Sequence, residues 1–260
     1  MKKIIGFLLI IALCIPALFA CDSVKDSLPS EIPQVTPEGT EKEKEISDVA
    51  KVAKMYEVSQ PTKVVATTKQ VLVKDILELN CSYEMVTGYI NGAPAYTFES
   101  STESIRTVEE GGKNDEVKPI KVPTTVLEEY IEGFGLRVST TVDGQTAVGN
   151  WDNNPELETK SIGKGKMAIN LKDKYVKNVE YEDGVLSFTI PSSKVSTVLG
   201  KTYAKYISGD VKVVITNDGA QITSIELEYT IAGDTGSHVV DSKMYVKVEY
   251  SYDIEKITID

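Results

Sequence analysis

The chain has 260 residues, a formal net charge of −11 and a single histidine. This acidic balance offers no basic patch for nucleic acid or for anionic lipid headgroups, and it argues against both as partners. One histidine also excludes zinc sites built from several histidines, and the hydrophobic fraction of 41% is that of an ordinary soluble domain.

Residues 1–20 are predicted to be a secretory signal. Two lysines precede an apolar run that is too short for a comfortable membrane span. The tetrapeptide Leu18-Phe19-Ala20-Cys21 then resembles the lipobox of bacterial lipoproteins. This resemblance implies that Cys21 is acylated, becomes the N-terminus and anchors the protein on the extracytoplasmic face of the cell membrane. The alternative is a plain signal peptide cleaved near Ala20, with Cys21 an ordinary thiol.

Residues 21–44 are expected to form a tether. Their prolines, hydroxyl residues and charged run cannot bury enough apolar area to offset the entropy of ordering, which predicts a disordered spacer. Residues 45–260 then form one folded domain. If Cys14 leaves with the signal and Cys21 is acylated, Cys81 has no cysteine with which to form a disulfide.

A helix is expected at the start of this domain. Apolar residues recur at helical spacing from Ile46 through Val49 and Ala53 to Tyr56, and Pro61 prevents continuation beyond Gln60. An amphipathic helix of this kind is expected to cover a sheet.

From Lys63 onward, strand patterns dominate. Apolar residues occupy every second position over residues 77–85 and again over residues 246–252, as in antiparallel strands with one solvated face. Four turn signals separate the alternating runs: Asn91-Gly92, Asp143-Gly144, Asp183-Gly184 and Asn217-Asp218-Gly219. The fold class predicted is therefore mostly β (α+β): a single curved antiparallel up-and-down sheet, or half-barrel, with a few helices on its concave face.

Four segments interrupt this pattern. Residues 109–123 are expected to be a charged loop, and Gly149 to Pro155 an irregular turn that holds the only tryptophan. Thr125 to Glu132 is ambiguous, because Thr125 and Glu128 match a helical capping box although a strand follows directly. Pro191 to Leu199 is expected to be a short helix, with Ser192 as N-cap and Gly200 as its end.

A helix followed by a curved antiparallel sheet on a lipid-anchored chain resembles the LolA/LppX-like half-barrel lipoproteins. Residues 55–90 look similar to uncharacterised lipoproteins of Gram-positive and wall-less bacteria, and the pattern of residues 217–229 is typical of the last hairpins in such sheets. The resemblance implies that the concavity binds or carries an apolar or acylated ligand, and it supplies no catalytic motif. The candidate ligand-binding residues are Tyr181, Phe188, Leu227, Tyr229, Val248 and Tyr250. The alternative for each of them is ordinary core.

Catalytic and metal-binding residues are few. A Cys81–His238 nucleophilic pair is formally available, but a cysteine in line with strand residues is usually an inert core thiol. Asp152, Asn153 and Asn154 offer oxygens to calcium without the spacing of an EF-hand, and Glu128, Glu129 and Asp152 are nominal acid–base candidates. We therefore expect a monomer that is not an enzyme and holds neither metal nor cofactor. The alternative function is a surface protein-interaction module with a filled core.

Overall fold

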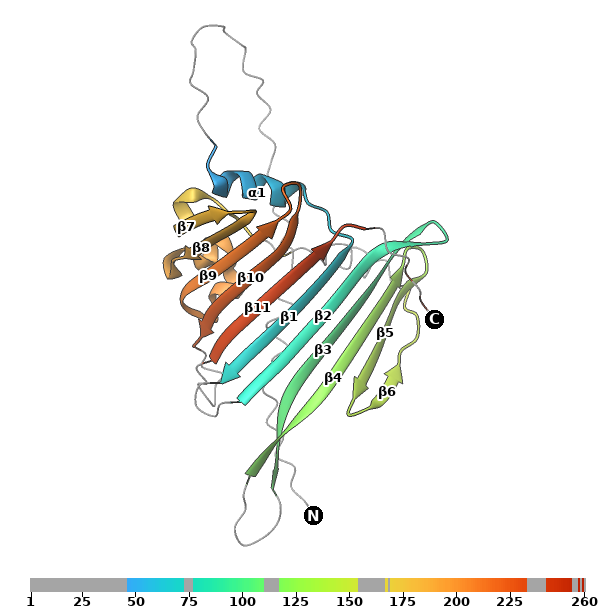
Figure 1. Cartoon of the computed structure of the whole chain (residues 1–260). Helices are drawn as coiled ribbons and strands as arrows, with labels where there is room; N and C mark the ends of the chain where they lie inside the picture. Colours follow the sequence, from blue (N-terminus) through green and yellow to red (C-terminus); the bar gives the residue numbers. More distant parts are fainter. Residues whose placement is uncertain are drawn as a thin grey trace, which may run out of the picture.

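A computed structural model describes residues 46–72, 77–109, 117–153, 167, 169–232, 242–253, 257 and 259. The strands in these ranges form one antiparallel sheet of eleven strands in the order β6-β5-β4-β3-β2-β1-β11-β10-β9-β8-β7 (Figure 1). The first and last strands pair at the centre of the sheet, and the end strands β6 and β7 do not pair with each other. The predicted fold class, a largely β half-barrel with few helices, is confirmed.

The sheet consists of two up-and-down meanders. The first runs outward from the centre and consists of β1 Lys63–Leu72, β2 Leu77–Ile90, β3 Ala93–Glu109, β4 Val117–Ile131, β5 Gly135–Val142 and β6 Gln145–Val148. The chain then crosses to the opposite edge. The second meander returns to the centre and consists of β7 Lys177–Glu182, β8 Val185–Ile190, β9 Ile207–Asn217, β10 Ile222–Ile231 and β11 Ser242–Ser251.

Three of the four predicted hairpin turns have two residues with positive φ, as a type I′ turn requires. The turns β2–β3, β5–β6 and β7–β8 have φ values of 52° and 85°, 51° and 77°, and 47° and 81° at their central residues. The β9–β10 turn differs, because only Gly219 has a positive φ there. The Asp218 carboxylate closes this turn by accepting the backbone N–H groups of Ala220 and Gln221 at 2.9 and 2.8 Å.

The expected loop at 109–123 is wrong at residue 109 and over residues 117–123, which are strand, while residues 110–116 lie outside the described residues. The helical alternative for 125–132 is wrong as well. Strand β3 extends to Glu109, and β4 occupies residues 117–131 without interruption. Pro119 and Pro123 fit this strand because β5 covers β4 only from Thr124 onward. Both prolines therefore lie where β4 has β3 on one side and no named strand on the other. The N–H that a proline lacks is tolerated at such an uncovered edge, because it has no neighbouring strand with which to pair.

The N-terminal helix α1 (Asp48–Val58) forms as predicted but starts two residues later. The Ser47 side chain caps it by accepting the N–H of Ala50, and the helix buries Val49, Val52 and Tyr56. Ile46 was expected on the buried face and is instead 61% exposed, because it precedes the cap. Residues 191–200 also differ in detail. Here a 3₁₀ turn, η4 (Ser192–Lys194), leads into α3 (Val195–Val198), and Ser192 makes no side-chain cap.

Two further short elements complete the chain: η3 (Asp173–Tyr175) and α4 (Lys201–Ala204). We call the sheet face on which α1 packs the inner face, and the opposite one the outer face. Strand β11 alternates strictly, with Met244, Val246, Val248 and Tyr250 buried on the inner face. No helix among the described residues is long and apolar enough to cross a membrane.

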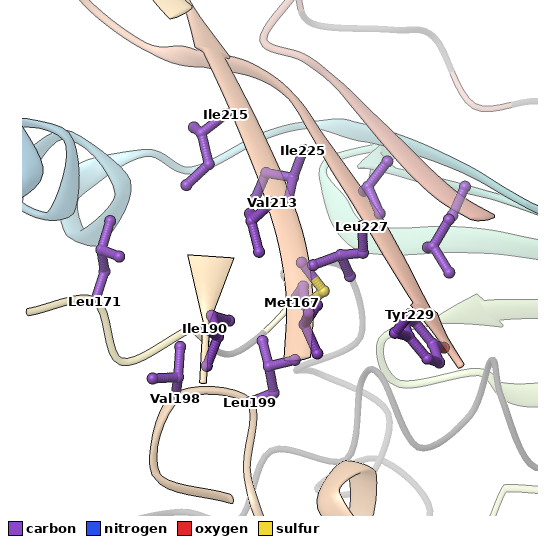
Figure 2. Close-up of a cluster of buried hydrophobic side chains, with 14 of the residues drawn as sticks. Met167, Leu171, Ile190, Val198, Leu199, Val213, Ile215, Ile225, Leu227 and Tyr229 are labelled. Atoms are coloured by element: carbon purple, nitrogen blue, oxygen red, sulfur yellow. The ribbon is translucent and has the colours of Figure 1, made fainter. Parts of the chain in front are cut away.

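The main core lies between the inner face and the helical segments. Figure 2 shows the sheet residues Val213, Ile225 and Leu227 facing Met167 and Leu199 of the covering segments. The helices pack mainly against β8, β9 and β10, on one half of the sheet. A smaller cluster on the outer face joins Ile257, near the C-terminus, to Val86 and Ala95.

Candidate functional site

Five of the six predicted ligand-binding residues lie together in the main core. Their exposures range from 0% at Val248 to 7% at Tyr250, and Phe188, Leu227 and Tyr229 belong to the same cluster. Tyr181 is separate from them. It lies on the edge strand β7 and is 40% exposed. A ligand could reach the buried five only if the covering segments moved.

Several tyrosines converge on the inner face. The Tyr56 hydroxyl of α1 donates to the backbone carbonyl of Met167, close to Tyr250 of β11. Burial raises the pKa of Tyr56 well above its ordinary value and that of Tyr250 to about 12, so both side chains are neutral phenols at physiological pH. Tyr83 packs against Phe98 with ring centroids 5.5 Å apart.

The inner face continues past the helices onto β3, β4 and β5. Tyr96 and Tyr130 are stacked there with ring centroids 5.2 Å apart, and both are buried. Farther out on β5, the register places Val138 and Val142 on the same face, and they are 39% and 44% exposed. Apolar side chains therefore continue from the packed core towards the β5 edge, beyond the part that the helices contact, and Glu128 of β4 lies among them, opposite Phe98 and Val138 in the register.

The outer face carries a shallow groove of about 690 Å³, which we call the outer groove. It crosses seven strands, from β9 to β4. Its outward-facing lining residues are Thr67, Lys69, Asn80, Ser82, Ser101, Glu103, Pro123, Lys212, Val214, Glu226, Glu228, Tyr245 and Lys247. None of them was predicted as a site residue.

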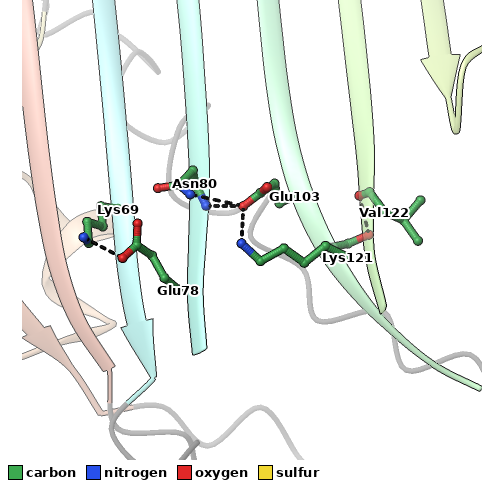
Figure 3. A network of polar contacts seen from close by, with 7 residues as sticks. Lys69, Glu78, Asn80, Glu103, Lys121 and Val122 are labelled. Carbon is green, nitrogen blue, oxygen red and sulfur yellow. Dashed lines mark hydrogen bonds and ion pairs between the residues drawn. The ribbon is translucent and has the colours of Figure 1, made fainter. Parts of the chain in front are cut away.

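Ion pairs hold the long side chains along this groove (Figure 3). The Glu103 carboxylate accepts the Asn80 backbone N–H at 2.8 Å and lies 3.2 Å from the Lys121 ammonium. Partial burial alone would raise the pKa of Glu103, but the Asn80 and Lys121 contacts outweigh it and the pKa is lowered. A second ion pair joins the Lys69 ammonium of β1 to the Glu78 carboxylate of β2 at 2.5 Å.

The tryptophan segment forms a polar and aromatic cluster at the β5 edge. The Trp151 ring lies under the Arg137 guanidinium, 5.0 Å from its centroid, and meets the Phe134 ring edge-on at 5.2 Å. Arg137 in turn pairs with Glu129 at 2.7 Å. The expected irregular turn is only partly irregular, because Asp152 exchanges two backbone hydrogen bonds with Leu136.

The nominal catalytic and metal-binding residues do not form a centre in the described part of the chain. Glu128 and Glu129 are adjacent strand residues on opposite faces of β4, and no group of three acidic, histidine or cysteine side chains with metal-binding geometry occurs among the described residues. Cys81 is a buried cysteine that forms no disulfide within the described part of the chain. His238, Asn154, the signal, Cys21 and the tether lie outside the described residues, so the predictions made for them stand as predictions.

Comparisons with known proteins give little support for an identity. No family model matches the sequence, and no curated protein matches it. A similar solved structure is that of LprF from Mycobacterium bovis, which is 12% identical with a TM-score of 0.30, over 82% of this chain and 95% of that chain. A likeness of this degree shows neither a common family nor a common function, and the resemblance to half-barrel lipoproteins remains a prediction.

Proposed function

We propose that the protein is a lipoprotein, anchored through Cys21 on the extracytoplasmic face of the membrane, whose sheet binds an apolar or acylated ligand without catalysing a reaction on it. The observation that supports the proposal most directly is the mismatch between the inner face and its cover. The helices pack mainly against β8 to β10, whereas apolar side chains continue to Val138 and Val142 on β5. An acyl chain lying along β3 to β5 would remove this surface from water.

The size of the effect follows from the hydrophobic contribution of the ligand. Each methylene taken out of water contributes about 0.8 kcal/mol, so a chain with about eight buried methylenes gains about 6 kcal/mol before the cost of association. Binding of this kind is set by apolar area, and it discriminates weakly between headgroups. The stacked and buried rings of Tyr96 and Tyr130 lie at the inner end of such a site.

Ligand binding is tested with mature chain carrying Cys21→Ser and a fluorescent fatty-acid probe. Val138→Asp introduces a carboxylate on the inner face and should weaken probe binding about tenfold or more, since it replaces apolar contact with a charge that must be desolvated. Ser139→Asp is the matched control, because the next residue of β5 faces the other side of the sheet. Equal probe binding by the two variants would contradict the proposed site.

Anchoring is tested separately. The wild-type protein should sediment with membranes and carry an acyl mass at its N-terminus in mass spectrometry, and Cys21→Ser should be released from the membrane fraction. A wild-type N-terminus other than Cys21, without added acyl mass, would remove the proposed anchor while leaving the ligand site untouched.

A protein-interaction module is the second candidate. The observation in its favour is that Phe188, Leu227, Tyr229, Val248 and Tyr250 fill a packed core and line no open concavity. On this alternative, native extracts contain no copurifying lipid and the wild-type protein gives no probe response. A protein partner would then be recovered by crosslinking at the cell surface.

A further inference from the structure

The outer groove is long and open, and it lies on the opposite side of the sheet from the proposed acyl site. It spans six strand-to-strand intervals from β9 to β4, which is about 29 Å along the sheet at about 4.8 Å per interval. A site of this shape suits an extended chain lying across the strands. A compact small molecule would fill only part of it.

The charges that line the groove balance. Three lysines, at positions 69, 212 and 247, face three glutamates, at positions 103, 226 and 228. Lys212 pairs with Glu228 at 3.3 Å across β9 and β10. A polyanion or polycation would therefore gain no net attraction here, and an apolar chain would have to desolvate the ion pairs. The groove favours a ligand that is polar and uncharged.

The floor of the groove is made of hydroxyl groups in register. Thr67 of β1 opposes Ser82 of β2, and Ser82 opposes Ser101 of β3, all on the outer face. Each hydroxyl both donates and accepts, and Asn80 adds an amide beside them. The backbone groups beneath are committed to the sheet ladder, so a peptide crossing the strands would find no main chain with which to pair.

Three apolar side chains lie among the polar residues of the groove. Tyr245 lies near the middle of the groove and is 39% exposed, with Val214 towards one end and Pro123 at the other. An exposed aromatic ring beside donor and acceptor side chains suits the face of a sugar ring, which presents C–H groups between its hydroxyls. We propose that the outer groove binds a neutral linear glycan, with Tyr245 as the stacking residue and Asn80, Ser82 and Glu103 among the groups that bond its hydroxyls.

The test is calorimetric titration of mature Cys21→Ser protein with neutral cello-, chito- and malto-oligosaccharides of two to six units. At least one series should bind, with affinity rising with chain length. Tyr245→Ala should weaken that binding at least tenfold, and Ser82→Leu, which fills the floor at an exposed position, should do the same. Tyr89→Ala is the control, because Tyr89 is 66% exposed at the far end of β2 and lies outside the groove.

Each other outcome overturns the inference. Failure of all neutral series to bind would overturn it, as would binding that Tyr245→Ala leaves unchanged in a variant with wild-type circular dichroism. Binding of an uncharged Ser/Asn/Gly peptide in place of the glycans would assign the groove to a polypeptide instead. Tyr245→Ala should leave the fatty-acid probe response intact, so failure of this inference is distinguishable from failure of the proposed function.

Discussion

Replacing Arg137 by methionine, on the outer face of β5, should destabilise the fold strongly. The Glu129 and Arg137 side chains are only 7% and 19% exposed, and they pair at 2.7 Å. Arg137→Met keeps the apolar stem and leaves the Glu129 carboxylate without its cation in a site that solvent barely reaches.

The magnitude follows from the burial. Breaking a buried ion pair from one side costs about 3–5 kcal/mol, and the partial exposure of Arg137 places this pair at about 3 kcal/mol. Loss of the guanidinium contact with Trp151 adds about 0.5–1 kcal/mol. The expected loss is therefore about 3–4 kcal/mol of unfolding free energy. Glu129→Gln combined with Arg137→Met should be more stable than Arg137→Met alone, because the second change removes the unbalanced charge.

Urea unfolding followed by far-ultraviolet circular dichroism measures these free energies for the four proteins of the cycle. Fluorescence of Trp151, the only tryptophan, reports the same site locally. A cost below about 1 kcal/mol for Arg137→Met would match an exposed pair screened by water. Such a value, or a double variant no more stable than the single one, would refute the reasoning.

Three further results are expected. Burial raises the pKa of Tyr250 to about 12, so the stability that its neutral form contributes should be complete below pH 10 and should fall as the pH rises from 10 towards 12. Tyr250→Phe should reduce this fall in unfolding free energy, as measured by unfolding curves at alkaline pH. Gly184→Ala should lower the unfolding free energy clearly more than Gly144→Ala. Both glycines have a positive φ (81° and 77°), but only at Gly184 would a new Cβ lie 2.5 Å from a backbone oxygen of β9. The Lys177 ammonium holds the pKa of Asp210 below its ordinary value of 3.8, so Asp210→Asn should lower the thermal midpoint at neutral pH, and this difference should shrink as the pH falls below that value.

Local patterns predicted the hairpins and the alternating strands well. A two-residue turn at Asn91-Gly92 also fixes the register of β2 on β3, so the opposition of Asn80 and Glu103 in the outer groove follows from the turn alone. No site was expected there because polar residues on a solvated face give no signal until several strands are placed side by side. The pairing that does so, β1 with β11, joins segments about 180 residues apart and leaves no local trace.

The same limit applies to β4 and to the predicted ligand residues. The charged, glycine-containing composition of residues 109–123 and the capping-box pattern at Thr125 outweighed the strand propensity of residues 117–131. The sequence also does not reveal that β5 leaves part of β4 uncovered. The alternation correctly placed Phe188 and Val248 on the inner face. Whether the inner face lines an empty cavity or a filled core depends on where Met167 and the helical segments lie. No periodicity in the sequence predicts their position.

The seam between β1 and β11 has a consequence for how the molecule is made. The outward meander can pair as it is synthesised, since each contact closes a short loop, but β1 cannot pair with β11 until the last residues of the chain are present. Until then, each half of the sheet exposes a strand edge with unpaired N–H and C=O groups, to which the other half or a neighbouring molecule can bind. A chain cut short by its final twenty residues would lose β11 and remain as two unjoined half-sheets.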